Sequence, residues 1–290
     1  MTIELMDLFG EHKAVKEPLT RDFLFGCLTE NLAGMTMEEF VALLTNKFNE
    51  VLEYSELSAG GRGCDKMSLL FNPHRLDVQT VGSPSSAWAG IKDPRFVSGL
   101  ARAVVFQKQN MQSNLLYAAL KIGVNGRQFV GEFPPRIARD IYRDYGVDAN
   151  SRVLDPCGGW GGRMIGASVV ANYYECYEPS TRTAAGLRAL SAFLASINPG
   201  FVARVHCAPY EDGTIKDAGA FDFALTSPPY YDTEWYAPGE KTNSMNRYIT
   251  FDAWCAGFFV PLVQRTLERL RPGRTFMLNI GSRRHPLSEV

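Results

Sequence analysis

The chain has 290 residues, of which 46% are hydrophobic and 12% aromatic, enough to bury one sizeable core with or without an accessory domain. It has no apolar run of about 18 residues, which argues against a membrane span, and no signal-peptide pattern, which argues against secretion. Its six cysteines include no CxxC pair and its four histidines do not cluster, which argues against a disulfide framework and a metal site. We therefore expect a cytoplasmic protein. The formal net charge of −1 excludes a chain that is cationic throughout, so any nucleic acid would bind through a local basic patch.

Residues 1–60 form an acidic region, with four basic and eleven acidic side chains. Residues 18–58 have the pattern of helices, because Thr36 and Glu39 form a predicted capping box and apolar residues recur at helical spacing after it. We expect a mainly helical N-terminal region that acts as a packing face, a dimerisation element or a lid.

Residues 61–132 follow a glycine-rich linker at 58–63 and are rich in Asn, Gln, Ser and Arg. Residues 61–150 carry twelve basic and seven acidic side chains, an excess of five positive charges. We therefore expect an accessory region that contacts the phosphates of a nucleic acid, although a mixed solvated surface explains the same charges equally well.

From residue 133 to residue 290, strands alternate with helices. The predicted strands are 152–155, 173–177, 201–207, 221–226 and 275–280. One predicted helix begins at Pro134–Pro135, and a second runs from the glycine-rich turn at 157–162 to Ala171. Two more cover 182–196 and 251–270. This alternation predicts an α/β fold with a mostly parallel sheet and helices on both faces. Ligands of such sheets bind beyond the carboxyl ends of the strands.

The first predicted strand runs into a glycine-dense turn, Asp155-Pro-Cys-Gly-Gly-Trp-Gly161. Glycines let the backbone turn tightly and let a ligand approach it closely. Glu178, at the end of the second strand, offers a carboxylate that can accept both hydroxyls of a ribose. The turn lacks the third glycine of a dinucleotide fingerprint and a phosphate-binding Lys-Ser/Thr pair. These features favour a nucleoside cofactor without phosphates, such as S-adenosylmethionine.

The most specific string in the sequence is Thr226-Ser-Pro-Pro-Tyr230. Its two prolines remove two backbone donors and leave carbonyl acceptors, while Ser227 adds a hydroxyl and Tyr230 a flat ring. This set suits a planar ring with an exocyclic amino group, which would stack on Tyr230 and donate its two hydrogens to the Ser227 side chain and the Pro228 carbonyl. The nitrogen lone pair would then face an electrophilic methyl group, so that transfer needs positioning and electrostatics without a covalent intermediate. The alternative interpretation is a strand-end turn capped by two prolines.

The segments Val153–Gly162, Glu178 and Thr226–Tyr230 resemble the class I S-adenosylmethionine-dependent amino-methyltransferases that modify DNA, whose signature is a D-P-F-x-G-x-G turn followed by (S/N/D)-P-P-(Y/F). Further similarity to bacterial and phage members lies in Tyr231–Tyr236, Asn243, Ser244, Tyr248 and Trp254. The resemblance covers residues 133–281. It implies a Rossmann-like class I methyltransferase domain over residues 133–290, in a bacterium or a phage-infected cell and with a role in restriction-modification.

The resemblance also implies two sets of site residues. The cofactor would be held by Phe133, Pro134, Asp155, Cys157, Gly159, Gly161, Glu178, Tyr210 and Glu211. The target base would be held by the catalytic residues Ser227, Pro228, Pro229 and Tyr230. Cys157 stands where the family usually has Phe and Trp160 where it has a small residue, which changes the expected shape of the methionine pocket. The pair Pro156-Cys157 also matches the nucleophile motif of cytosine C5-methyltransferases, but it lies in the first turn and not after the fourth strand.

The resemblance implies double-stranded DNA as the partner and an exocyclic base amine as the methyl acceptor. Because a serine begins the tetrapeptide, N4 of cytosine is favoured over N6 of adenine, and the enzyme would flip the base out of the duplex. Candidate DNA contacts in the basic region are Arg62, Arg75, Lys92, Arg95 and Arg127. Two other functions stay open: a methyltransferase for RNA or a protein glutamine amide, and a catalytically silent partner subunit that binds nucleic acid.

The chain ends ten residues after the fifth predicted strand, whereas this fold normally continues with an antiparallel pair of strands. We expect either a truncated fragment or a sheet completed by the N-terminal half, by a second copy in a homodimer, or by a partner chain.

Overall fold

The computed structural model describes residues 65–80, 83–90, 93, 130–214, 217–231, 234–236 and 240–281, together with single positions between 36 and 49. The chain divides into two compact units, of which the first comprises Met1–Leu43 and Pro73–Gly131 and the second comprises Leu44–Asn72 and Glu132–Val290. Most of the predicted helical region 18–58, and the domain boundary expected near residue 60, lie outside the described residues.

The first unit contains three short described elements. These are the 3₁₀ helix η2 (Pro73–Asp77), the strand β1 (Gln79–Thr80) and the helix α4 (Ala87–Gly90). The predicted capping box is confirmed, because the Glu39 amide donates to the Thr36 hydroxyl over 3.2 Å and the Thr36 amide donates to the Glu39 carboxylate over 2.7 Å.

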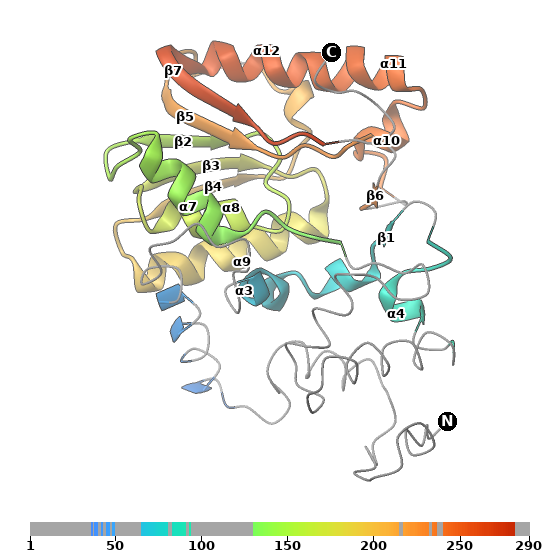
Figure 1. The fold of residues 1–290 in the computed structure, drawn as a ribbon, viewed down its shortest axis with the longest axis horizontal. Coiled ribbons are helices and arrows are strands. Elements are labelled where there is room, and N and C mark those ends of the chain that lie inside the picture. Colours follow the sequence, from blue (N-terminus) through green and yellow to red (C-terminus); the bar gives the residue numbers. More distant parts are fainter. Residues whose placement is uncertain are drawn as a thin grey trace. The chain divides into compact units, whose positions relative to one another are not determined.

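The second unit is built on a five-stranded sheet in the order β4-β3-β2-β5-β7, with every neighbouring pair parallel (Figure 1). Its strands are β2 (Arg152–Asp155), β3 (Tyr173–Tyr177), β4 (Val202–His206), β5 (Phe221–Thr226) and β7 (Leu270–Leu278). Its other described elements are α3 (Asp65–Phe71), α7 (Pro135–Asp144), α8 (Gly162–Ser168), α9 (Thr181–Ile197), η3 (Tyr210–Asp212), β6 (Glu234–Trp235), α10 (Ser244–Arg247), α11 (Phe251–Trp254), the π-helix η4 (Cys255–Phe259) and α12 (Val260–Arg269).

Helices cover the sheet on both faces. Figure 1 shows α7, α8 and α9 on one side and α12 on the other. The chain winds from β2 through α8 and α9 to the edge strand β4, and then returns to place β5 on the opposite side of β2. This is a doubly wound, Rossmann-like arrangement, and its order reverses between β2 and β5, where such folds bind their ligands. The predicted α/β class is therefore confirmed.

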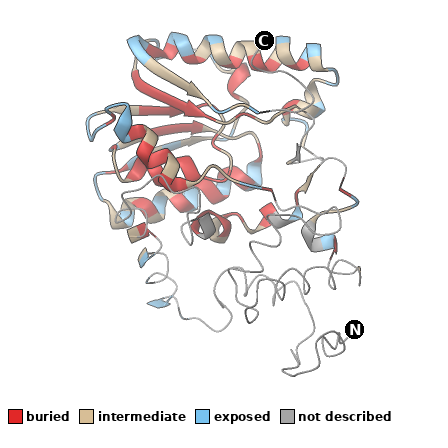
Figure 2. Ribbon diagram, in the orientation of Figure 1, coloured by how far each residue is buried: buried red, intermediate tan, exposed pale blue. Residues whose placement is uncertain are grey.

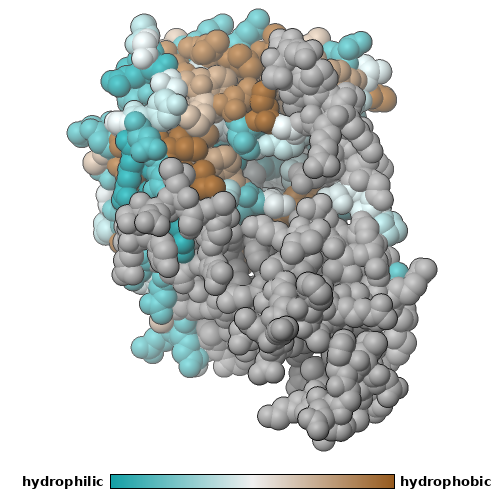
Figure 3. Space-filling view, viewed as in Figure 1, coloured by the Kyte–Doolittle hydropathy of each residue, from teal (hydrophilic) through white to brown (hydrophobic). Residues whose placement is uncertain are grey.

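The centre of the sheet is the most deeply buried part of the unit (Figure 2). Every residue of β5 is buried, which explains why this strand reads as a nearly continuous apolar run. On the α12 face, Trp254, Phe258 and Leu262 form one hydrophobic cluster with Leu154 of β2. Figure 3 shows brown, hydrophobic side chains gathered over the upper part of this unit, where α12 packs against the sheet.

The helix predicted at 251–270 is interrupted by a π-helical turn at Cys255–Phe259. Pro261 lies in the first turn of α12, and because proline has no amide hydrogen it cannot donate to the preceding turn. The wider turn accommodates this missing bond.

The last strand differs from its prediction of 275–280. β7 begins at Leu270, directly after α12, and pairs Leu270 with Phe221 and Thr275 with Phe223. The residues between these pairs bulge out of the ladder, and Gly273 there adopts a φ of +77°. Pro272 and Gly273, which follow the predicted helix 251–270, therefore form part of a bulge inside the strand. Among the described residues, no helix combines the length and apolar character that crossing a membrane requires.

Candidate functional site

The glycine turn, residues 156–161, joins the end of β2 to the start of α8. Gly159 and Gly161 have φ angles of +55° and +99°, a region that side chains rarely adopt. A Cβ on Gly161 would also lie 2.5 Å from a methyl carbon of Leu190. The Gly158 amide donates to the Tyr177 carbonyl over 2.8 Å. Backbone geometry and close packing against α9 and β3 therefore both require glycines here.

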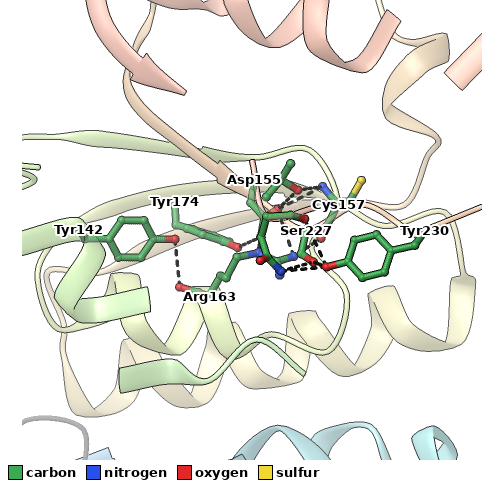
Figure 4. Close-up of polar contacts among 9 residues, drawn as sticks. Tyr142, Asp155, Cys157, Arg163, Tyr174, Ser227 and Tyr230 are labelled. Atoms are coloured by element: carbon green, nitrogen blue, oxygen red, sulfur yellow. Dashed lines mark hydrogen bonds and ion pairs between the residues drawn. The ribbon is translucent and has the colours of Figure 1, made fainter. Parts of the chain in front are cut away.

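Asp155 is the centre of a buried hydrogen-bond network (Figure 4). Its carboxylate is fully buried and accepts bonds from Arg163 over 2.8 Å, from the Thr226 hydroxyl over 2.8 Å and from the Cys157 amide over 3.2 Å. The Tyr174 hydroxyl donates to it as well. Because both oxygens are used by the protein, Asp155 holds the glycine turn in shape and has no oxygen directed at a ligand.

Phe133 and Pro134, which were predicted to hold the cofactor, lie beside this turn. Pro134 caps the N-terminus of α7, and the Arg163 guanidinium lies 5.6 Å from the centre of the Phe133 ring. A Cβ on Gly162 would collide with the Phe133 carbonyl oxygen, so only glycine lets these two segments approach. The structure thus brings Phe133 and Pro134 to the start of α8.

Glu178 follows β3 and reaches back to the glycine turn. Its carboxylate accepts from the Ser180 amide over 2.9 Å and from the Gly159 amide. Burial is the largest influence on this group and raises the pKa of Glu178 to about 7. The carboxylate predicted for ribose binding therefore lies beside the predicted turn and titrates near neutral pH.

Cys157 is half-buried in the turn. Burial and the nearby Asp155 carboxylate raise the pKa of its thiol well above the ordinary value. A cysteine nucleophile needs a lowered pKa, so the environment of Cys157 is the opposite of the one that the C5-methyltransferase alternative requires.

Tyr210 and Glu211, also predicted to hold the cofactor, lie in η3. The Tyr210 ring packs edge-on against Tyr177 with a centroid distance of 4.8 Å and belongs to the hydrophobic core, so its ring contributes to packing. Glu211 is 7% exposed and pairs with Arg247 over 2.8 Å, while the second guanidinium nitrogen of Arg247 pairs with Asp212 over 2.8 Å. Arg247 therefore ties the loop after β4 to α10.

The Ser-Pro-Pro-Tyr turn, Ser227–Tyr230, follows β5 directly. Pro228 is buried, whereas Ser227, Pro229 and Tyr230 are half-buried. The hydroxyls of Ser227 and Tyr230 lie 3.0 Å apart, and both accept from the side-chain amide of Asn279, over 3.0 and 2.9 Å.

Asn279 was not predicted as a site residue. The sequence signal that could have found it is a polar residue at the end of an apolar strand, the same position in which Ser227 follows β5. Its partners lie 49 and 52 residues away, so only the folded sheet brings them together.

Thr226, the last residue of β5, links the two halves of the site. Its hydroxyl donates to Asp155 over 2.8 Å and accepts from the Cys157 amide over 3.1 Å. The next residue is Ser227. The glycine turn and the Ser-Pro-Pro-Tyr turn are therefore joined through one side chain at the carboxyl ends of adjacent strands.

The predicted DNA contacts are mostly outside the described residues. Arg62, Lys92, Arg95 and Arg127 are not described, so their roles stay predictions. Arg75 lies in η2 and is fully buried. Its role as a DNA contact stays a prediction as well.

No family model matches the chain, and no curated protein matches it. Solved structures with a similar fold include an S-adenosylmethionine-dependent O-methyltransferase from Thermotoga maritima, with 12% identity, a TM-score of 0.37, and coverage of 53% of this chain and 47% of that one.

Two further similar structures differ from the first in what their names describe. An rRNA methylase from Streptococcus thermophilus has 11% identity, a TM-score of 0.34, and coverage of 51% of this chain and 70% of that one. A glycopeptide N-methyltransferase in complex with sinefungin has 17% identity, a TM-score of 0.33, and coverage of 51% and 54%. The chain spans about half the length of several structures that it matches. Similarity at this level does not identify a substrate.

Proposed function

We propose that this chain transfers a methyl group from S-adenosylmethionine to the exocyclic amino group of a base in DNA, with N4 of cytosine as the expected target. The observation that carries the proposal is the link through Thr226, which joins the glycine turn at Asp155 and Cys157 to the residue before Ser227. Methyl transfer needs the donor and acceptor sites within a few ångströms of each other, and this link supports that arrangement. DNA as the target follows from the resemblance of the sequence motifs.

The residues at the end of β2 and β3 fit a nucleoside without phosphates. Glu178 supplies a carboxylate beside the Gly159 amide, which suits two ribose hydroxyls. Arg163, whose guanidinium bonds the Cys157 carbonyl in the turn, is paired with the buried Asp155 and so does not offer its charge to a phosphate. When bound there, S-adenosylmethionine would supply the electrophilic methyl group.

The protein's own contribution is to hold the amino group and to direct its lone pair. Ser227 and the Pro228 carbonyl offer acceptors, and no hydrogen bond to this carbonyl is found among the described residues. The Tyr230 ring packs against the hydrophobic core, which gives a fixed plate for stacking. Ser227 and the Pro228 carbonyl would hold the amine while its nitrogen takes the methyl group that bound S-adenosylmethionine would supply with loss of its carbon–sulfur bond, and the nitrogen would then release one proton to water.

The test is incubation with tritiated S-adenosylmethionine and DNA, RNA or protein, followed by mass spectrometry of the modified nucleoside or amino acid. We expect label in DNA as N4-methylcytosine. Ser227→Ala should lower kcat by about 100-fold and leave the dissociation constant of the cofactor unchanged. The matched control is Ser196→Ala, at an exposed position of α9. Label only in RNA or protein would contradict the DNA target, and absence of both label and cofactor binding would favour a silent subunit.

A further inference from the structure

Ser227, Tyr230 and Asn279 are joined by hydrogen bonds at the proposed methyl-acceptor site. The two hydrogens of the Asn279 amide are donated to the Ser227 hydroxyl over 3.0 Å and to the Tyr230 hydroxyl over 2.9 Å. The two hydroxyls lie 3.0 Å apart. The Tyr230 hydroxyl also donates to the backbone carbonyl of Asn279 over 3.3 Å.

The number of protons in this cluster determines the direction of its bonds. A phenol carries one proton, and the Tyr230 proton is used in the bond to the Asn279 carbonyl. With this bond formed, the bond between the two hydroxyls uses the Ser227 proton. Ser227 also accepts one hydrogen from Asn279, and a hydroxyl has two acceptor lone pairs. One lone pair of Ser227 is left, and no proton.

We propose that Asn279 is a positioning residue that fixes Ser227 as an acceptor for the substrate's amino hydrogen. This inference rests on the proposed function. A serine hydroxyl that is free to rotate could donate its proton to the amine and occupy the lone pair that must attack the methyl group. The cluster prevents this, because the Ser227 proton is committed to Tyr230. The site then favours a group that donates hydrogen, such as an amino group, over a carbonyl oxygen.

The backbone holds Asn279 in place for this role. Its amide donates to the Thr226 carbonyl over 2.9 Å, which continues the pairing of β7 with β5 beyond Leu278. Thr226 is in turn bonded to Asp155. Thr226 therefore holds both Asn279 and the glycine turn. The backbone bond from the Asn279 amide does not depend on the side chain at this position.

The first experiment compares kcat and KM in the tritium assay for wild type, Asn279→Ala and Asn279→Asp. Asn279→Ala removes the two donors, and Asn279→Asp keeps the shape of the side chain but turns donors into acceptors. We expect kcat to fall about tenfold in both, with the KM for DNA and the dissociation constant of the cofactor within threefold of wild type. The matched control for charge is Asn150→Asp, at an exposed position before β2. Wild-type kcat in both Asn279 variants, or an equal loss of cofactor affinity, would overturn the positioning role.

A second experiment observes the cluster without turnover. In protein labelled with ¹⁵N-asparagine, the side-chain NH₂ signals of Asn279 are assigned by their disappearance in Asn279→Asp. We expect slow hydrogen exchange at these signals, and exchange at least tenfold faster in Tyr230→Phe, which loses one acceptor. Unprotected signals in wild type would overturn the cluster itself. If the signals are protected but wild type methylates no base amine, the proposed function fails and the amine-accepting role of Ser227 fails with it.

Discussion

The ionisation of Glu178 should change the stability of the protein near neutral pH. Its pKa is raised from 4.5 to about 7, chiefly by burial, so the folded protein holds this proton more tightly than the unfolded chain. The stabilisation that this proton contributes to the unfolding free energy is therefore complete below pH 4.5 and is lost as the pH rises through about 7. The difference between the two pKa values corresponds to about 3 kcal/mol. This value is a ceiling, because the ionised carboxylate relaxes towards water.

Glu178→Gln removes this titration while keeping a hydrogen-bonding side chain. We expect its unfolding free energy in urea to exceed that of wild type by about 1–3 kcal/mol at pH 8 and by about a quarter of that amount at pH 5. Glu268→Gln, at an exposed position of α12, is the matched control and should show no pH-dependent difference. Glu178→Gln should also bind S-adenosylmethionine more weakly in calorimetry, since the neutral amide is a poorer acceptor for two ribose hydroxyls. An equal stability difference at pH 5 and pH 8 would refute the reasoning.

Two further substitutions test the packing that supports the site. Gly161→Ala should destabilise the protein by about 2–4 kcal/mol in urea, because φ is +99° and the new Cβ would lie 2.5 Å from a methyl carbon of α9. The control is Gly219→Ala, also at positive φ but with open space around it, which should cost less. Equal losses of stability in the two variants would leave only backbone strain as the cause. Thr226→Val should lower the unfolding free energy by about 1–3 kcal/mol because the Asp155 carboxylate loses a donor, and unchanged stability would show that this link is unimportant.

The sequence alone determined most of the sheet. The strands at 152–155, 173–177 and 221–226 were predicted with the bounds that the structure has. They are buried on both faces of a parallel sheet, so they appear as short apolar runs between turn residues. The last strand was misjudged, since whether Pro272 and Gly273 end a helix or bulge from a strand depends on pairing with β5, which local sequence does not encode.

The candidate site follows the same division. The glycine turn, Glu178 and the Ser-Pro-Pro-Tyr turn were predicted from residue types that lie at strand ends, and parallel strands bring those ends to one edge. Their actual partners depend on contacts between distant residues: Thr226 with Asp155 is a separation of 71 residues, and Asn279 with Ser227 one of 52. Local composition decides which residues can bind a ligand, whereas the packed sheet decides which of their hydrogen-bonding groups are already used by the protein itself.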